Sequence, residues 1–120
     1  MKNFILTLFL LVTVHFSFGQ EVDTTMIVNG VCEMCQETIE KAALVKGVKN
    51  ASWSPETKIL QVTFDPEKTN LEKIGLAINA SGYDTEYAAA PEWAYEKLHG
   101  CCKYRDPKVI EAHEKKVHGQ

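Results

Sequence analysis

The sequence has no excess of positive charge, no apolar run long enough to span a bilayer and no recognisable catalytic constellation. Its 13 lysines and arginines stand against 16 aspartates and glutamates, a formal net charge of −3, which is neither the basic surface of a nucleic-acid-binding protein nor a polybasic membrane patch. A catalytic triad, a phosphate loop and paired carboxylates are all missing, so we expect a protein that is not an enzyme. With 120 residues, the chain has room for one small core with appendages.

Residues 1–19 have the pattern of a cleaved secretory signal. A positive start at Lys2 is followed by an apolar stretch over residues 4–14, and Ser17 and Gly19 supply small residues before a cleavage point. The apolar stretch is shorter than the roughly 20 residues that cross a bilayer. We therefore expect a secreted or periplasmic protein that is not anchored to the membrane after cleavage.

Four cysteines in an exported chain would ordinarily favour disulfide bonds. Here they occur as Cys32-x-x-Cys35 and as the adjacent pair Cys101 and Cys102. Small disulfide frameworks seldom space their cysteines in this way, and paired metal ligands explain the clustering better. We interpret both pairs as candidate ligands. A vicinal disulfide or an intermolecular bond stays open for Cys101 and Cys102.

The apolar pattern of residues 20–88 predicts one domain with the element order βαββαβ. Alternating β-branched residues indicate strands, and apolar residues at three- and four-residue spacing indicate helices. The expected strands cover residues 24–29, 48–53, 58–64 and 83–87, and the expected helices begin near Cys35 and Leu71. Thr69 and Glu72 have the spacing of a capping box before the second helix. This order is that of the α+β, ferredoxin-like sandwich.

Residues 89–120 form a second part of the chain, a C-terminal extension. A short helix over residues 92–99 is expected to end at Gly100. Asp106 and Pro107 suit the cap and the first residue of a polar helix whose apolar face is thin. We therefore predict a partly helical and partly disordered extension, in which His113 and His118 are interpreted as solvated helix residues.

The Cys32 and Cys35 pair is the strongest candidate site. Thiolate sulfur is soft, so such a pair selects Cu(I), Zn(II) and similar ions over Mg or Ca. Two sulfurs satisfy a near-linear ion such as Cu(I) or Hg(II), whereas structural zinc usually takes four ligands. The pair falls where a strand passes into a helix, and the helix start lowers a thiol pKa and offsets the charge of two thiolates.

Residues 24–88 resemble the heavy-metal-associated domain family, which includes copper chaperones, the N-terminal modules of copper-transporting ATPases and the periplasmic mercury-binding protein. The matching features are Cys32-x-x-Cys35 followed by Ile39, the turn Gly47-Val48, the strand end Val62-Thr63-Phe64-Asp65-Pro66, and Gly82-Tyr83. The resemblance implies one soft ion, Cu(I) first and Zn(II) or Hg(II) as alternatives, held by Cys32 and Cys35. It also implies transfer by thiolate exchange to a metal-transporting membrane protein or efflux system.

The metal loop departs from the family pattern Gly-Met-x-Cys-x-x-Cys. Gly30 stands one position nearer to Cys32, and no methionine precedes that cysteine. Met34 lies between the cysteines instead and is interpreted as a loop side chain rather than a weak ligand. Tyr83 occupies the place of an aromatic ring near the metal loop of related bacterial copper chaperones. It either shields the ion from water or is a half-buried aromatic at the sheet edge.

The sequence His99-Gly100-Cys101-Cys102 is a second cluster of soft or borderline ligands and lies outside the family domain. It is a candidate for a second metal site. Alternatively, the two cysteines fold back over Cys32 and Cys35 and complete a four-sulfur shell.

Two other functions stay open beside a metal carrier or scavenger. One is a thiol–disulfide oxidoreductase that uses Cys32 and Cys35, although the βαββαβ order is not that of thioredoxin. The other is an interaction module stabilised by zinc bound to all four cysteines. The sequence does not fix the oligomeric state.

Overall fold

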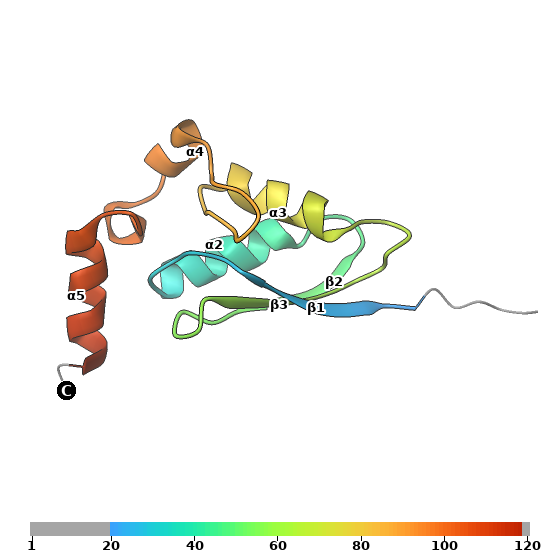
Figure 1. Ribbon diagram of the computed structural model, residues 1–120, viewed down its shortest axis with the longest axis horizontal. Coiled ribbons are helices and arrows are strands. Elements are labelled where there is room, and N and C mark those ends of the chain that lie inside the picture. Colours follow the sequence, from blue (N-terminus) through green and yellow to red (C-terminus); the bar gives the residue numbers. More distant parts are fainter. Residues whose placement is uncertain (1–19, 119–120) are drawn as a thin grey trace, which may run out of the picture.

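The computed structural model describes residues 20–118, with side chains as far as residue 115, as an α+β fold followed by a helical extension (Figure 1). Three antiparallel strands form one sheet in the order β1-β3-β2, and two helices cover one of its faces. The strands are β1 (Val22–Ile27), β2 (Val48–Trp53) and β3 (Ile59–Phe64), and the covering helices are α2 (Glu33–Ala43) and α3 (Leu71–Ala80). The ferredoxin-like fold class is confirmed.

Side chains that alternate along the strands build the core between the sheet and the helices. Leu60 and Val62 of β3 are buried, and Met26 of β1 pairs with Leu60 across the sheet. Ile39 of α2 and Ile78 of α3 close this core from the helical side. The alternation predicted from the sequence is therefore confirmed, because side chains on one face of a strand recur every second residue.

The helix starts differ from the predicted ones by a few residues. Cys32 is the N-cap of α2, so Cys35 lies inside the first turn of this helix rather than in the preceding loop. The N-cap of α3 is Asn70, whose side chain accepts a hydrogen bond of 2.9 Å from the backbone N–H of Lys73. The predicted capping box at Thr69 is thus wrong. Asn and Thr are both good caps, but here the Thr69 side chain is buried and does not cap the helix.

The last predicted strand is reduced to one bridge between Val28 and Thr85. Two further backbone hydrogen bonds flank it, from Asn29 to Asp84 (2.9 Å) and from Glu86 to Ile27 (3.0 Å). Beyond Thr85 the chain folds back, because the Thr85 N–H donates to the carbonyl of Ala88 at 2.9 Å rather than to β1. The element order is therefore βαββα, with the edge strand shortened to its first contact.

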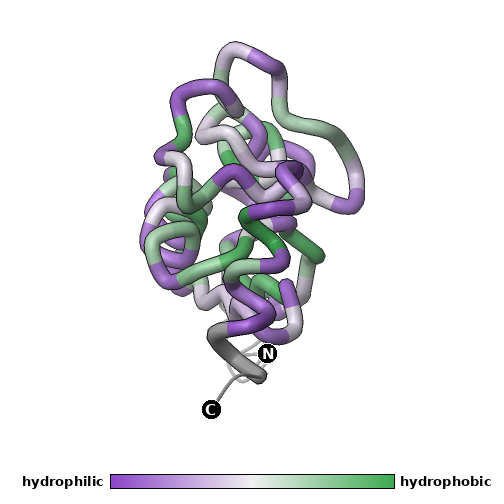
Figure 2. The backbone as a smooth tube through the Cα atoms, turned by 90° about the vertical axis from the view of Figure 1, so that its left-hand side faces the viewer, coloured by the Kyte–Doolittle hydropathy of each residue, from purple (hydrophilic) through white to green (hydrophobic). Residues whose placement is uncertain are grey.

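The extension continues as α4 (Glu92–Glu96), the short 3-10 helix η2 (Gly100–Cys102) and α5 (Pro107–His118). Asp106 begins α5 as predicted, and its carboxylate accepts a hydrogen bond of 2.9 Å from the N–H of Lys108. The extension lies at the end of the sheet from which α2 begins (Figure 1). Figure 2 looks onto this end, where the tube of α5 alternates between hydrophilic and hydrophobic residues.

Tyr104 and Arg105 fasten the extension to the domain, and we call this contact the clasp. The Tyr104 hydroxyl donates to the carbonyl of Gly82 at 2.8 Å and accepts from the N–H of Asp84 at 2.9 Å. The Arg105 guanidinium binds the Asp84 carboxylate at 2.7 Å. The Tyr104 ring also stacks on Tyr83, with the ring centroids 5.5 Å apart. The extension therefore packs on the domain.

The predicted signal segment, residues 1–19, lies outside the described residues. Within residues 20–118, none of the helices has both the length and the apolar character needed to cross a bilayer.

Loss of the Arg105 side chain should destabilise the fold. The Arg105 and Asp84 side chains are only 29% and 20% exposed, so Arg105→Gln leaves a partly buried carboxylate without its cation. We expect the free energy of unfolding to fall by about 1–2 kcal/mol, measured by urea denaturation. Lys49→Gln is the matched control, since Lys49 and Glu21 are 62% and 49% exposed, and its effect should stay below about 1 kcal/mol. Equal effects of the two substitutions would contradict a stabilising clasp.

Acid should weaken the clasp through Asp84. Burial acts to raise the pKa of this carboxyl, but the hydrogen bonds from Arg105 and from the N–H of Ala90 outweigh it and lower the pKa below its ordinary value of 3.8. The stability that the carboxylate contributes is therefore full above that value and is lost as the pH falls through the lowered pKa. In urea denaturation between pH 6 and about pH 2, wild type should converge on Asp84→Asn at the acidic end. A constant difference between them would contradict this assignment.

Candidate metal centre

The cysteine pair lies at the start of α2, where the geometry leaves both sulfurs free to bind a ligand. Cys32 has an extended backbone and its carbonyl accepts the N–H of Gln36 at 3.1 Å, but its side chain makes no capping hydrogen bond. Cys35 is on the buried face of the helix, one turn before Ile39. The two sulfurs converge at a distance of 3.4 Å. All four cysteines of the chain are free thiols.

Cys102 of η2 brings a third sulfur to this pair. Its sulfur lies 3.8 Å from that of Cys32, and the sulfurs of Cys32, Cys35 and Cys102 all lie within 4.8 Å of one another. Cys35 and Cys102 are buried, with 0% and 3% of their surface exposed, whereas Cys32 is half-buried. We call these three residues the three-sulfur group. Among residues 20–115, no other set of three histidine, cysteine or carboxylate donors comes as close together.

Tyr83 forms the floor of the three-sulfur group. Its side chain is fully buried, not half-buried at the sheet edge, and within the described part of the chain its hydroxyl has no hydrogen-bond partner. Burial raises the pKa of this hydroxyl, and the neighbouring thiols of Cys35 and Cys102 add to the shift. A buried O–H group without a partner is costly, and it gains one when a sulfur beside it becomes a thiolate. The site is thus arranged for ionised sulfur.

The three thiols do not ionise equally. Burial acts to raise the pKa of Cys35, but the Tyr83 hydroxyl and backbone groups of Val31 and Cys32 stabilise its thiolate more, so its pKa is lowered. Burial raises the pKa of Cys32 and of Cys102, and the thiol of Cys35 adds to both shifts, although the backbone of Cys35 offsets part of the shift at Cys32. Like charges in contact disfavour one another, so the group bears one negative charge more readily than three, and a cation is needed for the others.

Lys58 supplies a positive charge beside the site from the turn between β2 and β3. Its ammonium group donates to the carbonyl of Gly30 in the metal loop. Burial lowers its pKa, while the thiols of Cys32 and Cys35 favour its charged form. Together with the positive end of the α2 dipole, Lys58 offsets the negative charge of a thiolate centre. No pattern in the sequence points to this role, because Lys58 is remote from the cysteines in the chain.

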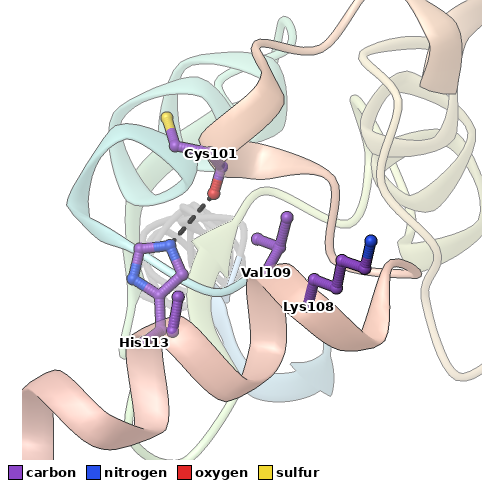
Figure 3. Close-up of a pocket in the computed structure, with 5 residues that line it drawn as sticks. Cys101, Lys108, Val109 and His113 are labelled. Atoms are coloured by element: carbon purple, nitrogen blue, oxygen red, sulfur yellow. Dashed lines mark hydrogen bonds between the residues drawn. The ribbon is translucent and has the colours of Figure 1, made fainter.

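The other predicted ligands lie outside the three-sulfur group. Cys101 is exposed, and its sulfur is 3.5 Å from that of Met34, which is exposed as well. The carbonyl of Cys101 accepts a hydrogen bond of 3.1 Å from Nε2 of His113, while the Cys101 sulfur points away from this ring (Figure 3). His99 is exposed and contributes its backbone carbonyl to the N–H of Cys102 at 2.8 Å. The side chain of His118 is outside the described part.

Trp53 and Gly30 shape the loop beneath the cysteines. A Cβ atom at Gly30 would lie 2.9 Å from the Trp53 ring and 3.1 Å from Cβ of Cys35. The Trp53 indole in turn donates to the carbonyl of Val28 at 3.0 Å. The shifted glycine of the metal loop therefore has a structural reason, which is the close approach of a buried tryptophan.

A βαββα fold with a cysteine pair at the first helix start defines a heavy-metal-associated domain. The sequence matches the family described as "Heavy-metal-associated domain" over residues 25–84, and the chain belongs to this family. The matched segment contains Cys32 and Cys35 and ends before the extension, so Cys102 comes from outside the family domain. The metallochaperone-like domains of this family are non-enzymatic, which confirms the expectation that the protein is not an enzyme.

Solved structures similar to this chain include three metal-handling proteins. A putative copper-ion-binding protein from Bacillus anthracis is 26% identical, with 57% of this chain and 99% of that one covered and a TM-score of 0.53. Oxidized MerP from Ralstonia metallidurans is 33% identical, with 56% of this chain and 96% of that one covered and a TM-score of 0.53. A copper-binding domain from HMA7, a P-type ATPase, is 32% identical, with 59% and 97% covered and a TM-score of 0.52. A search of curated proteins finds no match.

Replacement of Tyr83 by phenylalanine should raise the pKa of Cys35, because the O–H group that stabilises its thiolate is lost while the ring remains. The ultraviolet absorbance of the thiolate, followed against pH, measures this shift. Metal affinity should fall by about 10- to 100-fold, as for other groups that contact a ligand rather than the ion. Tyr87→Phe is the control, since Tyr87 is exposed. An unchanged titration in Tyr83→Phe would show that the hydroxyl does not act on Cys35.

Proposed function

We propose that this protein is a carrier or scavenger of a soft heavy-metal ion, Cu(I) foremost, that works outside the cytoplasm. Cys32 and Cys35 hold the ion as thiolates and pass it on by ligand exchange. The observation that carries the proposal is the convergence of the two sulfurs at 3.4 Å on a helix start, above a buried hydroxyl without a partner. Soft sulfur donors, with a lowered pKa at Cys35, suit Cu(I) and Hg(II) better than a hard cation.

Accessibility of the two sulfurs favours transfer. Cys32 is half-buried and reaches the surface, whereas Cys35 is fully buried. An acceptor thiolate therefore approaches the ion from the side of Cys32, and Cys35 keeps its bond until the acceptor has bound. A d¹⁰ ion tolerates such intermediates because it accepts two or three sulfurs at little cost.

The same geometry argues against a thiol–disulfide oxidoreductase. In that chemistry, the attacking cysteine is both accessible and a thiolate. Here Cys32 reaches the surface but burial raises its pKa, and Cys35 is fully buried. Neither sulfur therefore combines the two properties, while both sulfurs together remain good ligands once an ion replaces their protons.

The partner that fits this proposal is a metal-transporting membrane protein or efflux system. One solved structure similar to this chain is a domain from a P-type ATPase, and another is a metallochaperone named CopZ, 27% identical with a TM-score of 0.51. The signal-like pattern of residues 1–19 supports a location outside the cytoplasm. Zn(II) and Hg(II) are the alternative cargoes.

Metal competition tests the function. Reduced protein, kept anaerobic, should take Cu(I) from a moderate chelator with one ion per chain. Cys32→Ser/Cys35→Ser should lose more than about 100-fold in affinity, since even substitutions beside a ligand cost 10- to 100-fold. Glu33→Gln, a change between the cysteines, should bind as wild type. A wild type that fails to compete for Cu(I) and Hg(II) while it reduces insulin disulfides would overturn the proposal in favour of an oxidoreductase.

Location is tested by expression with the native leader. We expect the protein in the periplasmic or secreted fraction, with Gln20 as its first residue by N-terminal sequencing. Recovery of the uncleaved chain in the cytoplasmic fraction would contradict export.

A further inference from the structure

We propose that Cys102 is a third metal ligand, so that this protein holds its ion in a trigonal three-thiolate site rather than the two-cysteine site. The inference rests on the proposed function and deepens it. The ligand set is the three-sulfur group, in which the family domain supplies two sulfurs and the extension supplies the third. The cargo is a soft d¹⁰ ion that accepts three sulfurs, with Cu(I) and Hg(II) as the two probes.

Distances between the sulfurs favour three ligands over two. With a metal–sulfur distance of about 2.3 Å, a planar three-coordinate ion places its sulfurs about 4 Å apart, and a linear two-coordinate ion places them about 4.6 Å apart. The sulfur of Cys32 lies 3.4 Å from that of Cys35 and 3.8 Å from that of Cys102. These two distances are near the trigonal value and the third, between Cys35 and Cys102, is at most 4.8 Å. A linear ion would have to move the sulfurs of Cys32 and Cys35 apart by more than 1 Å.

The position of Cys102 is enforced by the clasp. Cys102 is two residues before Tyr104, whose side chain binds Gly82 and Asp84. The Tyr104 N–H also donates to the Cys102 carbonyl at 2.8 Å, which fixes the backbone between the two residues. The Cys102 N–H is held by the carbonyl of His99. As a result, Cys102 is 3% exposed and points inward, while its neighbour Cys101 is exposed. A cysteine pair that served only intermolecular bonding would not need one member buried against two other thiols.

The surroundings of the three-sulfur group suit the charge of such a centre. Three thiolates around Cu(I) carry a net charge of −2, which is costly in a buried site without compensation. The buried Tyr83 hydroxyl is a donor without a partner in the described residues, and the Lys58 ammonium binds the carbonyl of Gly30, two residues before Cys32. The thiols of Cys32 and Cys35 favour the charged form of Lys58, and those of Cys35 and Cys102 act on the Tyr83 hydroxyl. The N-terminus of α2 adds its dipole. Each sulfur of the group therefore has a compensating group nearby.

Binding converts three thiols into three metal–sulfur bonds without a change in oxidation state. Each S–H proton that the ion displaces goes to the buffer. A third ligand makes release slower, since Cys102 has to detach before a two-sulfur acceptor can take the ion. The extension therefore favours retention of the metal over rapid exchange.

X-ray absorption at the copper edge of the reduced, Cu(I)-loaded protein tests the ligand number. We expect three sulfur neighbours in wild type and in Cys101→Ser, and two in Cys102→Ser. Cys102→Ser should also lose Cu(I) to a chelator at least about 10-fold more readily than Cys101→Ser, its neighbour and matched control. Circular dichroism of each variant establishes that it is folded. The Hg(II) charge-transfer spectrum of wild type gives a second readout that needs no variant, because trigonal and linear centres absorb differently.

The outcomes separate this inference from the proposed function. Two sulfur neighbours in wild type, with equal retention by the Cys101→Ser and Cys102→Ser variants, would overturn the third ligand and leave the carrier intact. Four sulfur neighbours, with loss of one in Cys101→Ser, would overturn the trigonal site in favour of a four-sulfur shell. Failure of wild type to bind either ion would overturn both.

Discussion

The hydrogen bonds and ion pair between Tyr104, Arg105 and Asp84 are the interactions on which the site depends. They join the extension to the turn after α3, and this turn also carries Tyr83 beneath the cysteines. One contact therefore fixes both the floor of the site and the approach of Cys102. Because Arg105 and Asp84 are shielded from solvent in part, the pair is stronger than a surface ion pair of the kind that contributes little.

Repulsion between closely spaced sulfurs explains the chemistry of the site. Three thiols within 4.8 Å of one another bear one negative charge readily and three only with a cation among them. The domain supplies fixed groups for the first charge, namely Tyr83 and the start of α2. The bound ion itself has to compensate the remaining negative charge of the thiolates. The soft donor atoms favour a soft ion, and in the proposed three-sulfur site the number of ligands favours retention of that ion.

Local patterns in the sequence were enough to predict the fold of the domain, whereas the packing of the extension on the domain could not be predicted from such patterns. The alternation at Leu60 and Val62 and the Cys32-x-x-Cys35 spacing are short-range signals, and the structure confirms the fold they predicted. Asn70 rather than Thr69 caps α3, and Thr69 is buried. This difference depends on tertiary packing, which a local pattern does not contain. Cys102 and Cys32 are 70 positions apart in the sequence, and no periodic pattern predicts a contact over that distance. Sequence reasoning named Cys102 as a candidate but did not separate it from Cys101.

The distance in sequence between Cys32 and Cys102 has a consequence for the folding of the protein. An ion bound to both sulfurs closes a loop of about 70 residues that contains α2, β2, β3 and α3 of the domain, but not β1. A covalent crosslink over such a loop removes about 4 kcal/mol of chain entropy from the unfolded state, and a metal bridge acts in the same sense while it lasts. The bound ion would then also act as a reversible crosslink that stabilises the folded state. The lifetime of the folded protein would therefore depend on the supply of metal.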